Sequence, residues 1–298
     1  MEFLISSFES IPPAIRTLIL VSGLVLFWAA EGAIPLFRFQ YRRYRHAGLN
    51  IVFTLTTLVV NFGLAFMIVS AARFSSAQDF GVLYVAELPL WLHVVFGIMV
   101  LDLVGAWLIH WIQHRIRWMW KFHLIHHTDT NVDVTTALRH HPGESAFRAV
   151  FTALGVLIAG LPIGIVLLYQ TLSALFSQFN HANIGLPDRL DRALSWVIVT
   201  PNMHKVHHHF VQPLTDTNYG NIFSIWDRLF GTFAWVQDPQ TELTYGIDTH
   251  MSPEEHDRLW NLLAIPFQSY RPPSGSKFGD RDAPSRHDDS RRAAEATT

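Results

Sequence analysis

Three long apolar stretches constrain the fold of this chain more than any other feature. Residues 17–37 contain one charged residue, Glu31; residues 49–72 contain none; and residues 88–110 contain only Asp102. A helix of about 20 apolar residues crosses the hydrocarbon core of a bilayer, so each stretch is long enough to span a membrane. We expect Glu31, near the end of its stretch, to reach the arginines that follow it.

A fourth apolar region, residues 147–179, is interrupted by the turn Gly160-Leu-Pro162-Ile-Gly164. Glycine and proline break helices, so two shorter arms are predicted, joined as a hairpin that enters and leaves by one face. The connection over residues 38–46 contains four arginines, whereas residues 73–87 contain one arginine and two acids. The positive-inside rule then places the first connection in the cytoplasm.

The overall composition agrees with a membrane protein. Charged residues make up only 15 % of the chain, compared with about 25 % in soluble domains. The formal net charge of −2 excludes nucleic-acid binding driven by a basic field. We therefore expect an all-α integral membrane protein with four or five membrane segments, including the hairpin, and a cytoplasmic cap that is rich in histidine.

Histidine is the reactive residue that stands out, because twelve of the 17 histidines lie between His110 and His209 and cysteine is absent. Spacings of i, i+3 and i+4 place side chains on one helix face, where they reach a common metal ion. Eight histidines exceed the ligands that one ion takes, so two ions of Zn, Cu, Fe or Ni are implied. The three clusters comprise His110, His114, His123, His126, His127, His204, His207 and His208.

Three further motifs accompany these clusters. They are the loop His141-Pro-Gly-Glu144, the element Asn180-His181-Ala-Asn183, and residues 218–232, which begin Asn-Tyr-Gly-Asn. Together with the histidine spacing, they resemble the fatty acid hydroxylase and sterol desaturase superfamily over about residues 90–250. The resemblance implies a membrane-bound non-haem di-iron oxidoreductase. Such enzymes use O2 and two external electrons to hydroxylate or desaturate a lipid, such as a fatty acyl chain or a sterol.

The resemblance also implies roles for residues outside the three clusters. His181 matches the family's additional histidine and becomes a ninth metal ligand. His141 either ligates, or Glu144 orients a ligating histidine through its ring N–H. Asp102 is a functional candidate for a different reason, because it is an ionisable residue inside a predicted span. It hydrogen-bonds groups behind the ligands, caps the substrate cavity, or is satisfied by a Tyr, Trp or interhelical Arg side chain. Trp111 departs from the family, which usually has arginine directly after the first histidine.

The implied domain organisation follows the motifs. Residues 1–87 form N-terminal transmembrane helices, residues 88–250 form the catalytic domain, and residues 251–298 form a C-terminal segment that is disordered from about residue 272. We expect a multi-pass protein of a bacterial inner membrane rather than of the endoplasmic reticulum, with its active site on the cytoplasmic face.

The electrons must come from another protein. The chain contains no cysteine, no Gly-rich dinucleotide motif and no intact haem-binding domain. A ferredoxin or cytochrome with its reductase is therefore the expected donor. Its expected docking surface is a basic rim made of Lys205, Arg115, Arg117, Arg189 and Arg192.

Two other classes of protein remain alternatives. A histidine-ligated membrane zinc hydrolase would need a metal-bound water and a positioned carboxylate as base, and the H-E-x-x-H motif is absent. A metal transporter would place its ligands in the middle of several spans, whereas here the histidines flank the spans.

Overall fold

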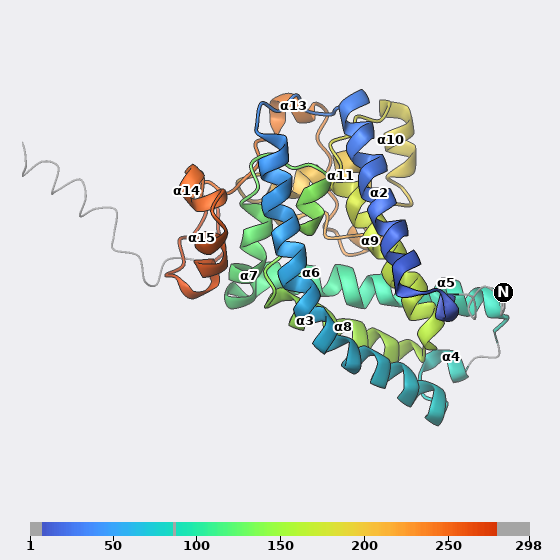
Figure 1. Ribbon diagram of the computed structural model, residues 1–298. Coiled ribbons are helices and arrows are strands. Elements are labelled where there is room, and N and C mark those ends of the chain that lie inside the picture. The colour runs from blue at the N-terminus through green and yellow to red at the C-terminus, as the bar shows by residue number, and fades with distance from the viewer. Residues whose placement is uncertain (1–7, 86–87, 279–298) are drawn as a thin grey trace, which may run out of the picture.

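The computed structural model describes residues 8–85 and 88–278, and these are mostly helical (Figure 1). Within these ranges no strand forms, and β-type pairing is limited to isolated bridges. The longer elements are α2 (Pro13–Ala33), α3 (Arg43–Gln78), α5 (Leu90–Asp102), the π-helix η1 (Leu103–Leu108), α6 (Ile109–Arg115), α7 (Arg117–His127), α8 (Glu144–Ala159) and α9 (Ile163–His181). The shorter ones are α4 (Val82–Val85), η2 (Val134–Leu138), α10 (Asp188–Leu194), α11 (Pro201–His207), η3 (Leu214–Asp216), α12 (Ile225–Leu229), α13 (Pro239–Glu242), α14 (Pro253–His256), α15 (Leu259–Ala264) and η4 (Ile265–Phe267).

Three helical segments are long and apolar enough to cross a membrane, namely Pro13–Ala33, Arg43–Val85 and Leu90–Arg115. They overlap the three stretches predicted from the sequence, although the first helix ends at Ala33 instead of residue 37, so the all-α membrane class is confirmed. The second helix begins at Arg43, earlier than expected, because no proline separates the arginine-rich connection from the apolar stretch. The number of further membrane segments and the cytoplasmic position of the cap remain predictions.

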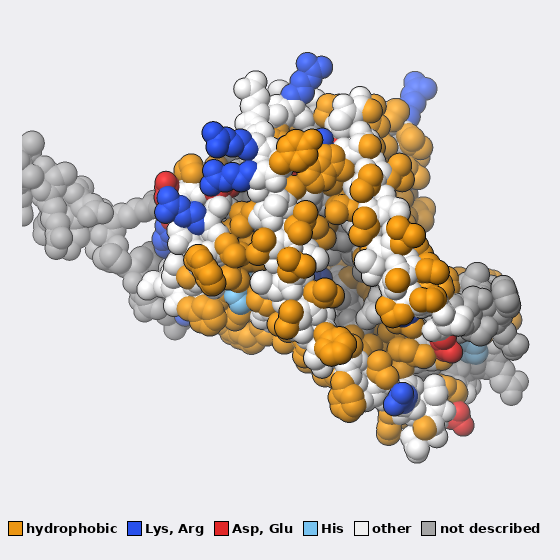
Figure 2. Space-filling view, in the orientation of Figure 1, with side chains coloured by type: hydrophobic (Ala, Val, Ile, Leu, Met, Phe, Trp, Pro, Cys, Tyr) orange, Lys and Arg blue, Asp and Glu red, His pale blue; other side chains and the backbone are white. Residues whose placement is uncertain are grey.

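The outer surfaces of these helices are apolar. Figure 2 shows hydrophobic side chains over the face formed by α2 and α3, while Lys and Arg gather near the connection between these two helices. Leu26, Phe62 and Phe66 are 65 %, 86 % and 77 % exposed. So much contiguous apolar surface is unusual on a soluble monomer, whereas it is the expected surface toward lipid.

The fourth apolar region is broken at the predicted turn. Helix α8 ends at Ala159, Gly160 adopts a left-handed conformation with φ of 79°, and Pro162 precedes α9. A Cβ on Gly160 would lie 2.6 Å from the Phe80 carbonyl oxygen, so the turn needs glycine for both its conformation and its close packing. The break is confirmed; the insertion of α8 and α9 into a membrane remains a prediction.

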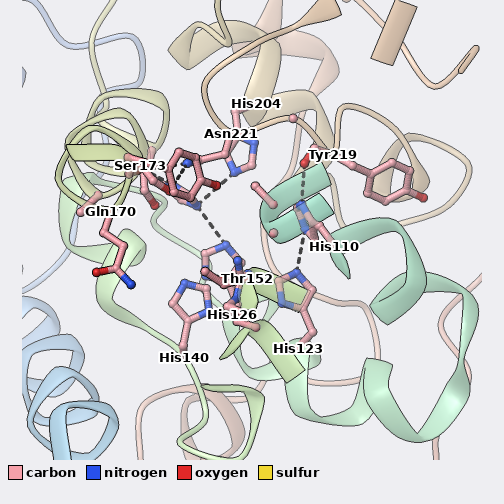
Figure 3. Close-up of a pocket in the computed structure, with 18 of the residues that line it drawn as sticks. His110, His123, His126, His140, Thr152, Gln170, Ser173, His204, Tyr219 and Asn221 are labelled. Carbon is pink, nitrogen blue, oxygen red and sulfur yellow. Dashed lines mark hydrogen bonds between the residues drawn. The ribbon is translucent and has the colours of Figure 1, made fainter. Parts of the chain in front are cut away.

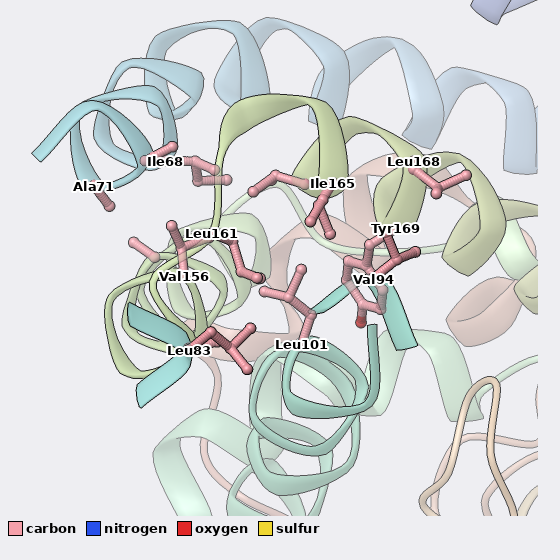
Figure 4. Packing of buried hydrophobic residues seen from close by; sticks show 14 of the residues in the cluster. Ile68, Ala71, Leu83, Val94, Leu101, Val156, Leu161, Ile165, Leu168 and Tyr169 are labelled. Atoms are coloured by element: carbon pink, nitrogen blue, oxygen red, sulfur yellow. The ribbon is translucent and has the colours of Figure 1, made fainter. Parts of the chain in front are cut away.

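A hydrophobic core joins α3, α5, α8 and α9 (Figure 4). Leu101, Val156, Leu161 and Ile165 are at most 1 % exposed there. Gly97 permits a close approach, since a Cβ at that position would lie 2.6 Å from Cδ2 of Leu161. This packing fixes α8 and α9 against the segment that leads from α5 into the histidine clusters.

Beyond the long helices, α10, α11 and α13 gather at one end of the molecule (Figure 1). Glu31 of α2 ties this end together: it pairs with Arg43 at 2.7 Å and accepts hydrogen bonds from the amides of Val134 and Asn183 at 2.6 and 2.7 Å. The expected contact with an arginine is therefore present. Glu31 is only 5 % exposed, so it acts inside the protein and not at the membrane surface.

Candidate metal centre

The first two histidines lie on α6, directly after the π-helix η1. His110 and His114 are one turn apart and share a face, as their spacing predicts. Nδ1 of His110 donates to the Tyr219 carbonyl at 2.9 Å, and Nδ1 of His114 lies 3.1 Å from Asp216 Oδ1. These partners occupy Nδ1 and leave Nε2 of both rings available as a metal ligand.

The other ligand candidates come from α7, α9 and α11. Helix α7 carries His123, His126 and His127; α9 ends on His181; and α11 with the residue after it carries the last cluster. Nδ1 of His207 donates to the Thr217 carbonyl at 2.7 Å, and Nδ1 of His181 donates to the Ser177 carbonyl at 2.7 Å. Local backbone carbonyls therefore orient these rings as well.

The nine histidines form two groups whose ring nitrogens lie within 4.8 Å of one another. All nine side chains are buried, being at most 7 % exposed. Segments 81 residues apart in sequence thus meet at one site. The first group is His110, His114, His123, His127 and His207, and the second group is His126, His181, His204 and His208.

The donor atoms fit metal ions. Nε2 of His110 lies 3.0 Å from Nε2 of His123, and Nε2 of His181 lies 3.0 Å from Nε2 of both His126 and His204. Two nitrogens that share one ion at about 2.1 Å stand roughly 3.0 to 3.4 Å apart. Several other ring nitrogens are buried and have no hydrogen-bond partner among the described residues, including Nε2 of His114 and His207 and both nitrogens of His127 and His208.

Unpaired buried nitrogens are costly, at about 1–3 kcal/mol each, unless a ligand satisfies them. Burial lowers the pKa of His207 to about 3 and holds the pKa of His126, His127, His204 and His208 well below the ordinary value. The rings are therefore neutral at pH 7, which is the form that binds a metal.

Glu144 lies behind the first group. Its Oε1 accepts from Nδ1 of His123 at 3.1 Å and from Nε of Arg148 at 2.8 Å. Its Oε2 lies 3.2 Å from Nδ1 of His140, whose ring stacks on that of His126. This geometry matches the alternative in which Glu144 orients a ligating histidine. The sequence favoured a surface or packing role for His140, because nothing in the pair His140-His141 indicates which ring faces the site.

His141 and Asp102 lie outside both groups. Nδ1 of His141 accepts the Gly143 amide at 2.9 Å. Asp102 accepts from the amides of Ile222 and Phe223 at 3.2 and 3.0 Å and from Nε1 of Trp226 at 3.0 Å. Asp102 thus anchors the segment whose Tyr219 carbonyl orients His110. Its partner Trp226 is one of the side-chain types that the sequence analysis expected to satisfy this carboxylate.

A second carboxylate, Asp227, holds the same segment. It accepts from the amides of Tyr219 and Gly220 at 2.8 and 2.9 Å and from Nε1 of Trp107 at 3.0 Å. Trp111, at the family's arginine position, stacks on Trp107 with ring centroids 6.1 Å apart. The contact beside His110 at this position is therefore aromatic and not ionic.

The expected basic rim needs one correction. Lys205 is fully buried, and its Nζ donates to the carbonyls of Val132 and His181 at 3.1 and 2.7 Å. It therefore stabilises the site from inside and cannot meet a partner protein. Burial also lowers the pKa of Lys205. The four rim residues that do lie on the surface are Arg115, Arg117, Arg189 and Arg192.

A chamber of about 350 Å³ adjoins the histidines (Figure 3). Rings from both groups line it, among them His110, His123, His126 and His204. Ser173, Tyr219 and Asn221 add polar atoms to its wall. The chamber gives a substrate direct access to the atoms that would surround two metal ions.

Comparison with known proteins agrees with these motifs. Residues 94–232 match the family described as fatty acid hydroxylase. The chain is 28 % identical over 145 residues to the ornithine lipid hydroxylase OlsE of Rhizobium tropici, covering 49 % of this chain and 43 % of the relative. It is 32 % identical over 159 residues to an alkylglycerol monooxygenase of Caenorhabditis elegans. This match covers 52 % of this chain and 30 % of the relative.

A cholesterol 25-hydroxylase-like protein of Danio rerio is 27 % identical over 160 residues, covering 50 % of this chain and 60 % of the relative. The match thus spans less than two thirds of each of these relatives. No solved structure matches the chain significantly. The resemblance predicted from the histidine motifs is confirmed: residues 94–232 of the chain match the fatty acid hydroxylase family.

Proposed function

We propose that this protein is a membrane-bound non-haem di-iron oxidoreductase that uses O2 and external electrons to hydroxylate a lipid. One observation carries the proposal: two buried groups of ring nitrogens line a chamber beside helices with apolar outer surfaces. The names of the relatives, which include lipid hydroxylases and monooxygenases, support the reaction class. The substrate class is a fatty acyl lipid or a sterol.

In this proposal each histidine group holds one iron ion. The two ions would supply the activation of O2 for oxidation of a C–H bond. Glu144 fixes the orientation and tautomer of His123, while Asp102 acts through the segment that orients His110. His141 has no ligand role, because its ring lies outside both groups.

The electron donor is a separate ferredoxin or cytochrome with its reductase. The four exposed arginines of the rim would attract an acidic partner. The positive-inside rule places the arginine-rich connection, and with it the active site, on the cytoplasmic face. A bacterial inner membrane is the proposed location.

Substitution of single histidines tests the proposal. His126→Ala and His207→Ala each remove one ligand from a different group, so each variant should lose bound iron and lipid hydroxylation. His209→Ala is the matched control, because His209 adjoins the last cluster while its Nδ1 accepts the Thr244 amide instead of joining either group. Full iron content and activity in either of the first two variants would refute the ligand assignment.

The zinc hydrolase alternative predicts a different result. Neither histidine group contains a carboxylate, and both oxygens of Glu144 are engaged by His123, Arg148 and His140. A free general base is therefore absent from the two groups. Ester hydrolysis by zinc-loaded protein, without any O2 consumption, would favour this alternative.

A further inference from the structure

A second cavity, of about 570 Å³, lies beside the metal chamber and is enclosed by α2, α3, α8 and α9. Figure 2 shows a hollow between α2 and α3 on the apolar face of the molecule. We call this second cavity the groove. Much of its wall is hydrocarbon, contributed by Leu20, Leu58, Leu64, Ile68 and Leu167. Such a lining fits an acyl chain, and most of it comes from α2 and α3, which are candidate membrane spans.

Polar side chains mark the boundary between the groove and the chamber. Asn61 from α3, Arg148 from α8 and Gln170 from α9 line both cavities. We call these three residues the polar collar. Because they come from three helices, no sequence periodicity brings them together, and their convergence is a product of the fold. Any molecule that passes from the groove to the histidines passes the collar.

The collar has unused hydrogen-bond donors. The amides of Asn61 and Gln170 are exposed and have no hydrogen-bond partner in the described part of the chain. Arg148 uses Nε for Glu144, at 2.8 Å, and its two terminal nitrogens remain unpaired there. Unpaired polar groups that face hydrocarbon are costly, so these donors select a ligand that carries acceptor oxygens.

The chamber beyond the collar is smaller than the groove and its wall is more polar. Its volume of about 350 Å³ is near the lower end of the range for ligand sites, which is roughly 300–1,000 Å³. Tyr169, Ser173 and Ser177 line it together with the histidine rings, and Figure 3 shows Gln170 and Ser173 on the same side of the cavity. A short polar end of a lipid fits this chamber better than a long hydrocarbon tail.

We propose, on the basis of the proposed function, that the substrate is an acyl lipid whose carbonyl oxygen binds the polar collar. Its chain lies in the groove, its polar end lies in the chamber, and the oxidised carbon lies close to the carbonyl. One atom of O2 enters the C–H bond to give an alcohol, and the other leaves as water. Two electrons from the external donor and two protons complete the balance.

Binding to the metal-loaded protein without O2 tests the collar independently of turnover. The probes are radiolabelled methyl palmitate, palmitamide and hexadecane, which distinguish an ester, an amide and no carbonyl on similar chains. If the collar amides donate two hydrogen bonds to the carbonyl oxygen, the wild type should bind the ester, the amide or both at least about tenfold more tightly than hexadecane. The double variant Asn61→Leu/Gln170→Leu should lose that preference and keep its iron.

The matched control is Phe62→Leu, since Phe62 adjoins Asn61, is 86 % exposed and lines neither cavity. This variant should bind all probes as the wild type does. Equal binding of carbonyl probes and hexadecane by the wild type, or an unchanged preference in the double variant, would overturn the collar proposal.

Product analysis with an added redox system then locates the new hydroxyl group. Hydroxylation close to the carbonyl supports the proposed binding mode, and hydroxylation toward the methyl end overturns it. If loaded protein binds with the predicted preference yet oxidises no lipid, the proposed function fails while the collar stands.

Discussion

Substitution of Glu144 by glutamine tests whether the groups behind the ligands control metal affinity. Glu144 is fully buried and its carboxylate serves three partners: His123 at 3.1 Å, Arg148 at 2.8 Å and His140 at 3.2 Å. In Glu144→Gln one acceptor oxygen becomes an NH2 group, and the negative charge disappears. At least one charge-assisted hydrogen bond is therefore lost, and the Arg148 charge remains without its partner.

The expected effect follows from these contacts. A hydrogen bond to a charged group contributes about 1.5–3 kcal/mol, which corresponds to roughly a 10- to 100-fold change in an equilibrium constant. Loss of a carboxylate behind a metal-ligating histidine weakens metal binding by a similar 10- to 100-fold. We therefore expect Glu144→Gln to bind Fe²⁺ about 10- to 100-fold more weakly while the other eight histidine ligands remain in place.

Competition with a chelator under anaerobic conditions measures this affinity. Glu254→Gln is the matched control, because Glu254 pairs with Arg258 at 3.9 Å on the surface and lies far along the chain from the nine histidines of the two groups. It should retain the wild-type affinity. Wild-type iron affinity in Glu144→Gln would refute the claim that Glu144 supports His123 as a ligand.

Three further predictions concern stability, pH and electrons. Asp102→Asn replaces an acceptor of three hydrogen bonds, so it should lower the free energy of unfolding by about 2–4 kcal/mol, and an unchanged denaturation midpoint would contradict this. Burial lowers the pKa of His207 to about 3 in the folded protein, below its value of about 6.5 in the unfolded chain. The contribution of the neutral ring to stability is therefore present above pH 6.5 and is lost as the pH falls toward 3. Metal-free protein should melt at a lower temperature at pH 5.5 than at pH 7.5, and equal melting temperatures would refute this. Purified protein with NADPH, O2 and lipid should be inactive until a ferredoxin or cytochrome system is added, and added salt should slow the restored reaction; sustained turnover without a redox protein would contradict the external donor.

Local sequence patterns were sufficient for the spans and the ligand clusters. Long uncharged stretches specify membrane helices by length alone, and the i, i+4 spacing of His110 and His114 places both rings on one face. The turn at Gly160 was predictable because glycine and proline close together in sequence break a helix. Each of these inferences depends only on neighbours along one helix.

Contacts between distant segments were not predictable in the same way. Lys205 seemed a surface residue because lysine is rarely buried, yet the seven-residue helix α11 is enclosed on several sides and its lysine satisfies two carbonyls. The pairing of His114 with Asp216 joins residues 102 positions apart, and no periodicity links them. The polar collar has the same origin in tertiary packing.

The metal content of anaerobically purified protein tests the central claim most directly. Two buried histidine groups predict two iron ions per chain, with loss of iron in His126→Ala and in His207→Ala and retention in His209→Ala. Iron at this stoichiometry would support the di-iron assignment. Stoichiometric zinc that resists exchange for iron and supports ester hydrolysis would contradict it.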